Sequence, residues 1–311
     1  MGKKHPNIFV DIINEDVWVF LSHSHKDYDK VIQVRNLLEK RNIRPIMFFL
    51  KCLEDDTEVD ALIKREIDSR HRFILCDSKN AKESNWVQEE VKYIKEEKNR
   101  SYETIDLDNM SIEEIDNKLQ EFEKRLSICY IYTSDRTMDY NILVGEAINY
   151  GFRIKSLCVD EIKYSDIVDV IKDFLNVCYV CLIINDSIVQ NIAVPISELG
   201  KESKRLIFMK RNERNMFTRI VNSLNFEQAM DLSQYAWGQA KVDLLEQAIY
   251  NGGTPSMQFI LANIYEKGLY GIKKDLYEAL SIYEDMLHSD GIATNNHIDR
   301  VHKLIEESEH S

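Results

Sequence analysis

Hydrophobic positions in the first third of the chain form short apolar runs, separated by segments whose apolar residues recur at helical spacing. The predicted strands are residues 17–22, 43–49, 73–76 and about 102–107. Between the second and third strands, Leu62, Ile63 and Ile67 lie on one face of a predicted helix. Strands that alternate with helices over short connections predict a parallel sheet covered by helices on both faces.

The same order of elements then starts again. Apolar runs at about 128–133, 154–159, 177–184 and 205–209 predict strands, and helical patterns lie between them. This repetition indicates a divergent internal duplication of the first unit. Counting along the copy places Pro195 where the first unit has Trp86, and Leu199 where it has Glu90. We therefore expect the copy to lack any site built from those two residues.

From about Phe226 the pattern is helical only. Small residues and tyrosines recur with the spacing of paired helices joined by a glycine turn, as in residues 262–283. Repeats of this kind bury their core only against neighbours. The predicted organisation is an N-terminal tail (1–13), an α/β domain (14–126), a second, smaller α/β domain (127–225) and a helical-repeat region (226–311).

The charge composition limits the classes of binding partner that the protein is expected to have. The 311 residues carry a formal net charge of −13, and the pI is about 5.2. This balance argues against nucleic acid or an anionic membrane as the main partner, but not against a dinucleotide, which needs only local donors. The sequence shows no secretory signal pattern and no apolar run of about 20 residues. We expect a soluble cytoplasmic protein.

The six cysteines lie in apolar, strand-like runs. Cys178 and Cys181 form a C-x-x-C pattern, but residues three apart in a strand face opposite sides of the sheet. That placement fits neither a zinc site nor a redox motif at a helix start. We expect all six to be buried free thiols in a reducing compartment, and we predict no metal site.

Residues 77–91 carry the strongest candidate chemistry. An apolar strand leads into a polar turn, and Ser84 or Asn85 can cap the following helix. Trp86 and Glu90 are four residues apart and share one face of that helix. An indole beside a carboxylate, at the carboxyl end of a parallel strand, can hold a ring and stabilise a developing cation. The alternative is that Trp86 is a core residue and Glu90 a solvated helix charge.

Three segments of the first unit resemble a Toll/interleukin-1 receptor (TIR) domain of the bacterial type. They are V-F-L-S-H-S-H-K-D at residues 19–27, the helix at 61–69 with its following strand, and S-x-W-V-x-x-E at residues 84–90. Together they span roughly residues 14–126. The last segment is the one that distinguishes NAD-cleaving members from adaptors. Residues 261–283 resemble a Sel1-like repeat, which is related to tetratricopeptide repeats.

The resemblance implies a flavodoxin-like parallel sheet and an enzyme that cleaves the nicotinamide–ribose bond of NAD. Its products would be nicotinamide and either ADP-ribose or a cyclic ADP-ribose isomer. Glu90 matches the essential glutamate, and Trp86 matches the aromatic residue one turn before it. Ser22 and His23 match the loop that lines the cleft, and Phe49 matches the loop that closes over the nucleotide and makes assembly contacts. NAD would be the substrate, with no further cofactor.

Two exposed loop residues extend this expected substrate site. Lys26 or His25 could neutralise the pyrophosphate, or both could be solvated and idle. Many active relatives carry a basic residue soon after the first strand, where this chain has His23 and His25. A histidine pair can bring a pH dependence near neutrality, although ordinary loop histidines are the simpler interpretation.

Three hypotheses for function follow. The first is an NAD glycohydrolase or cyclase of the TIR type, acting in bacterial antiviral defence signalling. It would self-associate through TIR domains, and a protein partner or regulator would bind its helical repeats. The second is a non-catalytic TIR scaffold or adaptor that acts by protein–protein interaction. The third is a nucleoside-processing transferase, which also sets a carboxylate against a ribose C1′.

Overall fold

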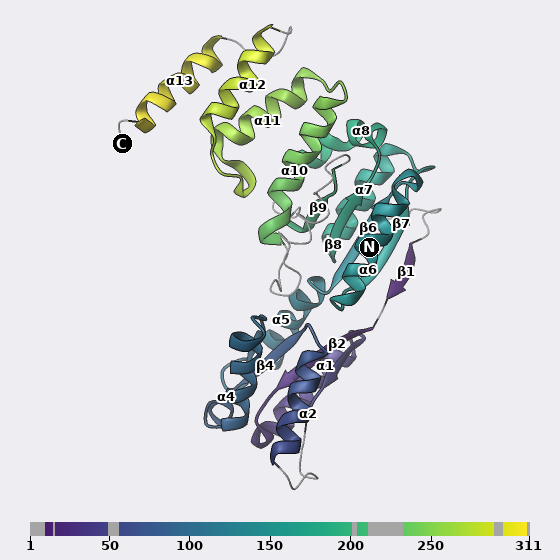
Figure 1. Cartoon of the computed structure of the whole chain (residues 1–311), viewed down its shortest axis with the longest axis vertical. Helices are drawn as coiled ribbons and strands as arrows, with labels where there is room; N and C mark the ends of the chain where they lie inside the picture. The colour runs from purple at the N-terminus through teal and green to yellow at the C-terminus, as the bar shows by residue number, and fades with distance from the viewer. Residues whose placement is uncertain are drawn as a thin grey trace.

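The computed structural model describes residues 10–14, 16–48, 56–200, 204–210, 233–288 and 295–309. It contains two mainly parallel sheets followed by a helical tail (Figure 1). The mixed α/β fold class and the helical C-terminal segment are as the sequence predicts. In Figure 1 the first sheet is purple and blue, the second is teal apart from its purple edge strand β1, and the tail is green to yellow.

The first sheet is entirely parallel, with the strand order β3-β2-β4-β5. Its strands are β2 (Val17–Ser22), β3 (Ile43–Ile46), β4 (Phe73–Asp77) and β5 (Glu103–Asp106). The predicted second strand is shorter than expected at its carboxyl end, where residues 49–55 lie outside the described part. We call residues 16–126 the first unit.

Helices cover both faces of the first sheet. They are α1 (Tyr28–Glu39), α2 (Asp56–Asp68), α3 (Lys79–Lys82), α4 (Asn85–Lys92) and α5 (Ile112–Lys124), with η1 (His25–Asp27) and the π-helical turn η2 (Tyr93–Glu97). Apolar residues of α1 and α5 pack on one face, and those of α2 and η2 pack on the other. Ser111 caps α5, and Ser111 and Glu114 form a reciprocal capping box.

The second sheet repeats the parallel strand order of the first and adds one antiparallel edge strand, giving β1-β7-β6-β8-β9. Its strands are β1 (Asp11–Asn14), β6 (Ser127–Tyr132), β7 (Arg153–Cys158), β8 (Tyr179–Ile183) and β9 (Leu206–Phe208). We call β1 with residues 127–210 the second unit. Residues 11–13, expected in an N-terminal tail, instead form part of a strand. They supply the ladder partners that the edge of β7 would otherwise lack.

Helices of the second unit are α6 (Thr137–Asn149), α7 (Tyr164–Leu175) and α8 (Asp186–Ser197), with η3 (Ser134–Arg136) before α6. Cys178 and Cys181 belong to the cores on opposite faces of the sheet, as the strand spacing predicts. Cys158 is exposed at the end of β7, so the prediction that every cysteine is buried is wrong there. Cys52 lies outside the described residues.

The helical tail consists of α10 (Ser233–Tyr250), α11 (Pro255–Lys267), α12 (Leu276–His288) and α13 (Asn295–Glu309), with the short turn η5 (Leu269–Gly271). Apolar residues of α10 and α11 share one core with α7 and α8, so the tail is docked on the second unit. Farther out, Arg300 and Tyr283 both donate to the buried carboxylate of Glu266, which ties α11, α12 and α13 together. Within the described residues, no helix is long and apolar enough to cross a membrane.

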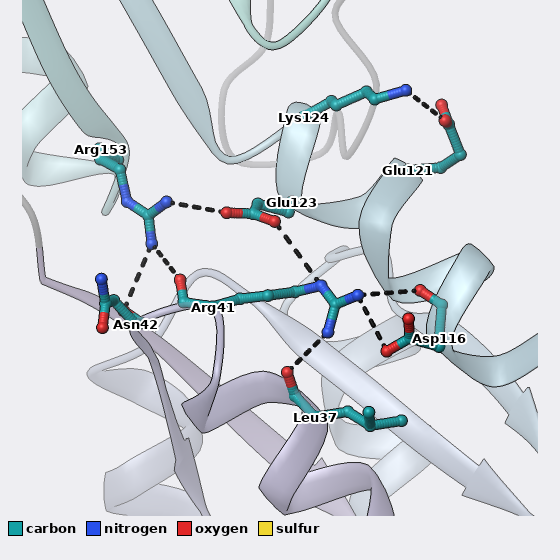
Figure 2. Close-up of polar contacts among 8 residues, drawn as sticks. All are labelled: Leu37, Arg41, Asn42, Asp116, Glu121, Glu123, Lys124 and Arg153. Carbon is teal, nitrogen blue, oxygen red and sulfur yellow. Dashed lines mark hydrogen bonds and ion pairs between the residues drawn. The ribbon is translucent and has the colours of Figure 1, made fainter. Parts of the chain in front are cut away.

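A polar seam joins the two units at the amino-terminal ends of their strands (Figure 2). The Arg153 guanidinium, at the start of β7, contacts Glu123 at 3.2 Å and donates to the carbonyl oxygen of Arg41 at 2.8 Å. On another part of the seam, the His71 ring packs edge-on against Tyr150. Because amino ends meet at the seam, the carboxyl ends of both parallel sheets point away from it, and those are the ends where open α/β sheets bind ligands.

Candidate functional site

The helix α4 begins directly after β4 and α3, at the carboxyl end of the first sheet. The Ser84 hydroxyl accepts a hydrogen bond from the Val87 amide, so the cap predicted from the sequence is Ser84. Val87 faces the core and fixes the rotation of the helix. Trp86 and Glu90 consequently lie one turn apart on the side that faces α2.

The carboxylate of Glu90 is held by the end of a neighbouring strand. The hydroxyl of Ser22, the last residue of β2, donates to Glu90 Oε2 at 2.5 Å. Ser22 is buried, and Glu90 is partly buried. Burial raises the pKa of Glu90 to about 7, and the hydrogen bond from Ser22 opposes that shift. Glu90 is therefore a positioned carboxyl group that can change charge near neutral pH.

A narrow pocket lies between α2 and α4, with the Glu90 side chain in its wall. Its volume is about 10 Å³, which is room for about one water molecule. It is lined by Asp60, Ile63, Lys64, Ile67, Trp86, Glu89, Glu90 and Tyr93. Trp86 is 38% exposed, so it is not a core residue. The pocket combines an apolar floor with one indole, one carboxyl group of raised pKa and one ion pair.

The ion pair stands on α2. Lys64 Nζ lies 2.9 Å from Asp60 Oδ2 and 5.5 Å from the centroid of the Tyr93 ring. The hydrogen bond to Asp60 raises the pKa of Lys64. Lys64 and Asp60 therefore line the same pocket as Glu90 as an ion pair, and an anionic group of a ligand would have to displace Asp60 to reach the Lys64 ammonium group.

A buried carboxylate ties together the two loops that build this site. Asp27, at the end of η1, accepts hydrogen bonds from the Ser78 hydroxyl at 2.5 Å and from the Asn80 amide at 2.7 Å. Ser78 in turn caps α3 through the Ala81 amide. The loop after β2, which carries Ser22, is thus linked to the segment after β4, which leads into α4.

The structure brings together some of the residues expected from the sequence and separates others. Ser22 and Trp86 lie beside Glu90. The ring of His23 turns back to the carbonyl oxygen of Leu21 at 3.0 Å, and burial lowers its pKa. His25 and Lys26 are exposed on η1, and like His23 they do not line the described pocket. Phe49 lies outside the described residues.

Residues of α2 and Asp27 are the parts of the site that the sequence did not reveal. The helical spacing of Ile63 and Ile67 predicted a buried face for α2, but not that this face would lie opposite α4. Lys64 and Asp60 could have been found as an i,i+4 charge pair on that helix. Nothing in the sequence pairs Asp27 with Ser78, since 51 residues separate them.

Comparison with known families bears on the unit that contains this site. Residues 19–126 match the TIR domain family. This part of the chain is a TIR domain. The match begins within β2 and ends just beyond α5, so the TIR domain contains Ser22, Asp27, Trp86, Glu90 and all of α2. No curated protein matches the chain.

The second unit has the same parallel strand order as the TIR domain but different residues at the corresponding places. Tyr132 ends β6 where Ser22 ends β2, and its ring stacks on Tyr140 with centroids 4.1 Å apart. Arg136 ends η3 where Asp27 ends η1, and it donates to the carbonyl oxygens of Ile184 and Met209. Leu199, at the counted position of Glu90, is buried. Stacked aromatic rings and a buried guanidinium therefore occupy this edge.

No group of three or more potential metal-ligating side chains gathers anywhere in the described part of the chain. The chemistry that the residues around Glu90 offer is that of a carboxyl group, an ammonium group and an aromatic ring. Together these can stabilise positive charge on a ligand, hold an anionic group and stack against a planar ring.

Proposed function

We propose that the TIR domain cleaves the bond between nicotinamide and ribose in NAD, with Glu90 as the carboxylate that stabilises the reacting sugar. The observation that carries this proposal is the contact between Ser22 and Glu90 beside the exposed Trp86. A lone surface glutamate would have neither a buried serine as donor nor a raised pKa.

The reaction needs negative charge near the ribose. As the C1′–N bond breaks, nicotinamide leaves with the bonding electron pair and becomes neutral, and positive charge spreads over C1′ and O4′. A carboxylate fixed beforehand by a hydrogen bond stabilises that charge without reorganising in the transition state. The pyridinium of NAD is already a good leaving group, so no acid is required for its departure.

The second half of the reaction decides the product. Attack of water on C1′, with loss of a proton, gives ADP-ribose, whereas attack by the adenine end of the same molecule gives a cyclic isomer. Glu90 is suited to accept the proton, because its pKa of about 7 lies close to the working pH. Trp86, an exposed residue of the pocket lining, is suited to stack on a planar ring and to limit the access of water.

Substrate binding requires the pocket to widen. A volume of about 10 Å³ does not hold a ribose, so side chains of α2 and α4 must move apart around Glu90. Lys64 is placed to meet a phosphate once its pair with Asp60 is exchanged. In this proposal α2 contacts the phosphates of NAD, and α4 contacts the bond that is cleaved.

The biological setting follows from the resemblance to bacterial TIR proteins. We place the activity in cytoplasmic antiviral defence signalling, with self-association of TIR domains as part of activation. The helical tail, similar to Sel1-like repeats around residues 261–283, would bind a protein regulator.

The deciding experiment measures free nicotinamide released from NAD by the purified full chain at high protein concentration. We expect release from the wild type, loss of at least about a hundredfold in Glu90→Gln, and near-normal release in Glu96→Gln, an exposed glutamate of η2 that does not line the pocket. Absence of nicotinamide release, together with no protection of the fold by NAD, would favour a scaffold. Cleavage of free nucleosides but not NAD would favour a transferase.

A further inference from the structure

The outward face of α6 is an uncharged surface with exposed apolar residues. Met138 is 78% exposed, and Ile142 and Ile148 are each 41% exposed. Asn141, Gly145 and Asn149 are exposed on the same side of the helix. We call these six residues the α6 stripe. At 100° per residue they occupy one arc of the helix, and Asp139 and Glu146 fall outside it.

Within the described part of the chain, all six residues of the α6 stripe are exposed. The helix α6 packs on one face of the second sheet (Figure 1). Among the described helices, it is the one that contributes residues to the core on that face. Tyr140, Leu143, Val144 and Ala147 form the inward side of the helix. Exposed isoleucines and a methionine on the opposite side suit contact with another molecule.

Gly145 lies in the middle of this face, and the fold itself does not explain it. A Cβ atom at this position would meet nothing within 4 Å, and Gly145 is not among the glycines with positive φ. A glycine inside an exposed helix costs about 1 kcal/mol relative to alanine. Its advantage is that another helix backbone can approach closely at this point.

The exposed isoleucines and asparagines of the stripe are placed symmetrically about Gly145. Reading outward in both directions, isoleucine stands three residues away on each side (Ile142 and Ile148), and asparagine stands four residues away (Asn141 and Asn149). In an antiparallel pair related by a two-fold axis at Gly145, Ile142 of one helix meets Ile148 of the other. Asn141 meets Asn149 in the same way, and amide side chains can both donate and accept. The isoleucine and asparagine positions of the stripe are therefore complementary to themselves about this axis.

We propose that two copies of this chain pair through α6, antiparallel, about a two-fold axis at Gly145. Self-complementarity is what a two-fold symmetric interface requires. The uncharged stripe also lets two chains of net charge −13 meet without opposing like charges at the contact. One helix pair buries less than the roughly 1,200 Å² of a standard interface, so the dimer is weak and concentration-dependent. The interface belongs to the second unit and does not rest on NAD cleavage.

The test measures the mass of the purified full chain by sedimentation over roughly a hundredfold range of concentration. We expect a monomer–dimer equilibrium in the wild type that is weakened at least about tenfold by Ile142→Lys or by Gly145→Leu. A change to lysine at an exposed apolar residue of the helical tail, Leu287→Lys, should leave the equilibrium unchanged.

Paired substitutions test the antiparallel register. The double variant Ile142→Lys/Ile148→Glu sets opposite charges against each other at both ends of the interface, so it should dimerise more strongly than either single variant. The matched double variant Ile142→Lys/Ile148→Lys should stay monomeric. A wild type that is monomeric throughout, a dimer indifferent to these changes, or equal behaviour of the two double variants would overturn the proposal.

Discussion

The hydroxyl of Ser22 lies 2.5 Å from the carboxylate of Glu90, although 68 residues separate them in the chain. Ser22 ends β2, and Glu90 lies on the helix that follows β4, so two neighbouring parallel strands bring the pair together. This contact positions the carboxyl group on which the proposed chemistry depends, and it opposes the rise in pKa that burial causes.

Removing the Ser22 hydroxyl should change the pH dependence of NAD cleavage. In Ser22→Ala the hydrogen bond that opposes burial is lost, so the pKa of Glu90 should rise above its present value of about 7. If the ionised carboxylate stabilises the sugar cation, kcat/KM falls as pH drops through that pKa. The acid limb of the pH profile for nicotinamide release should therefore move to higher pH in the variant.

The matched control is Ser24→Ala, because Ser24 is also buried in the loop after β2 but caps η1 through the Lys26 amide. Its acid limb should stay where the wild type has it. A uniform loss of rate at every pH in Ser22→Ala would show that the hydroxyl only positions Glu90 and does not tune it.

Asp27 should affect both stability and NAD cleavage, because it links the two loops that build the site. Replacing it in Asp27→Asn removes the charged acceptor for Ser78 and Asn80, at a cost of about 1–3 kcal/mol in the free energy of unfolding. Displacement of α4 by even about 1 Å can lower a rate up to about a hundredfold. We expect lower kcat for NAD cleavage, and a lower midpoint in urea.

Asp29→Asn provides the comparison, since Asp29 is exposed two residues further along the same segment. It should change neither quantity measurably. If Asp27→Asn loses stability but cleaves NAD at the normal rate, the link between the two loops is structural only.

How far the sequence predicted this structure depends on the range of the contacts involved. Local signals were sufficient for β2 and for the Ser84 cap, since each depends on residues within one turn or one strand. The placement of Trp86 and Glu90 on one helix face came from spacing alone. Repetition in the sequence also predicted the matching parallel strand order of the two sheets.

Contacts distant in the chain were not predictable in the same way. The packing of α2 against α4, the Asp27 acceptor and the pairing of β1 with β7 each depend on how separate elements meet. The start of α7 shows that a local signal can also mislead. A serine at position 165 favours an N-cap there, but the N-cap is Lys163, two residues earlier.

Glu90→Gln should stabilise the TIR domain at high pH. Burial raises the folded-state pKa of Glu90 to about 7 from the ordinary value of 4.5. Stability from the neutral carboxyl group is thus fully present below pH 4.5 and is lost as pH rises through 7. The loss is on the order of 2 kcal/mol, after allowance for partial exposure. The variant has no such loss, so urea denaturation at pH 8 should favour it, and the difference should vanish near pH 4.5.

His71, which packs against Tyr150 at the seam, should give the opposite pH dependence of the free energy of unfolding. Burial, helped by the charges of Arg100 and Arg72, lowers the folded-state pKa of His71 from 6.5 to about 4. Stability from the neutral ring is present above pH 6.5 and is lost as pH falls through 4, again on the order of 2 kcal/mol. Between pH 4.5 and 6.5 the effects of His71 and Glu90 therefore oppose each other in the wild type.

In the wild type the two opposing pH effects partly cancel, so each should be measurable only in a variant that lacks the other group. His71→Gln should leave only the Glu90 effect, so its free energy of unfolding should fall as pH rises from 4.5 to 6.5. Glu90→Gln should leave only the His71 effect, so its free energy of unfolding should rise over the same window. Urea titrations at pH 4.5, 5.5 and 6.5 measure both slopes. His288→Gln, in the helical tail, is the control and should follow the wild type. If the free energy of unfolding depends on pH in the same way in both variants, the proposed pKa shifts of Glu90 and His71 are wrong.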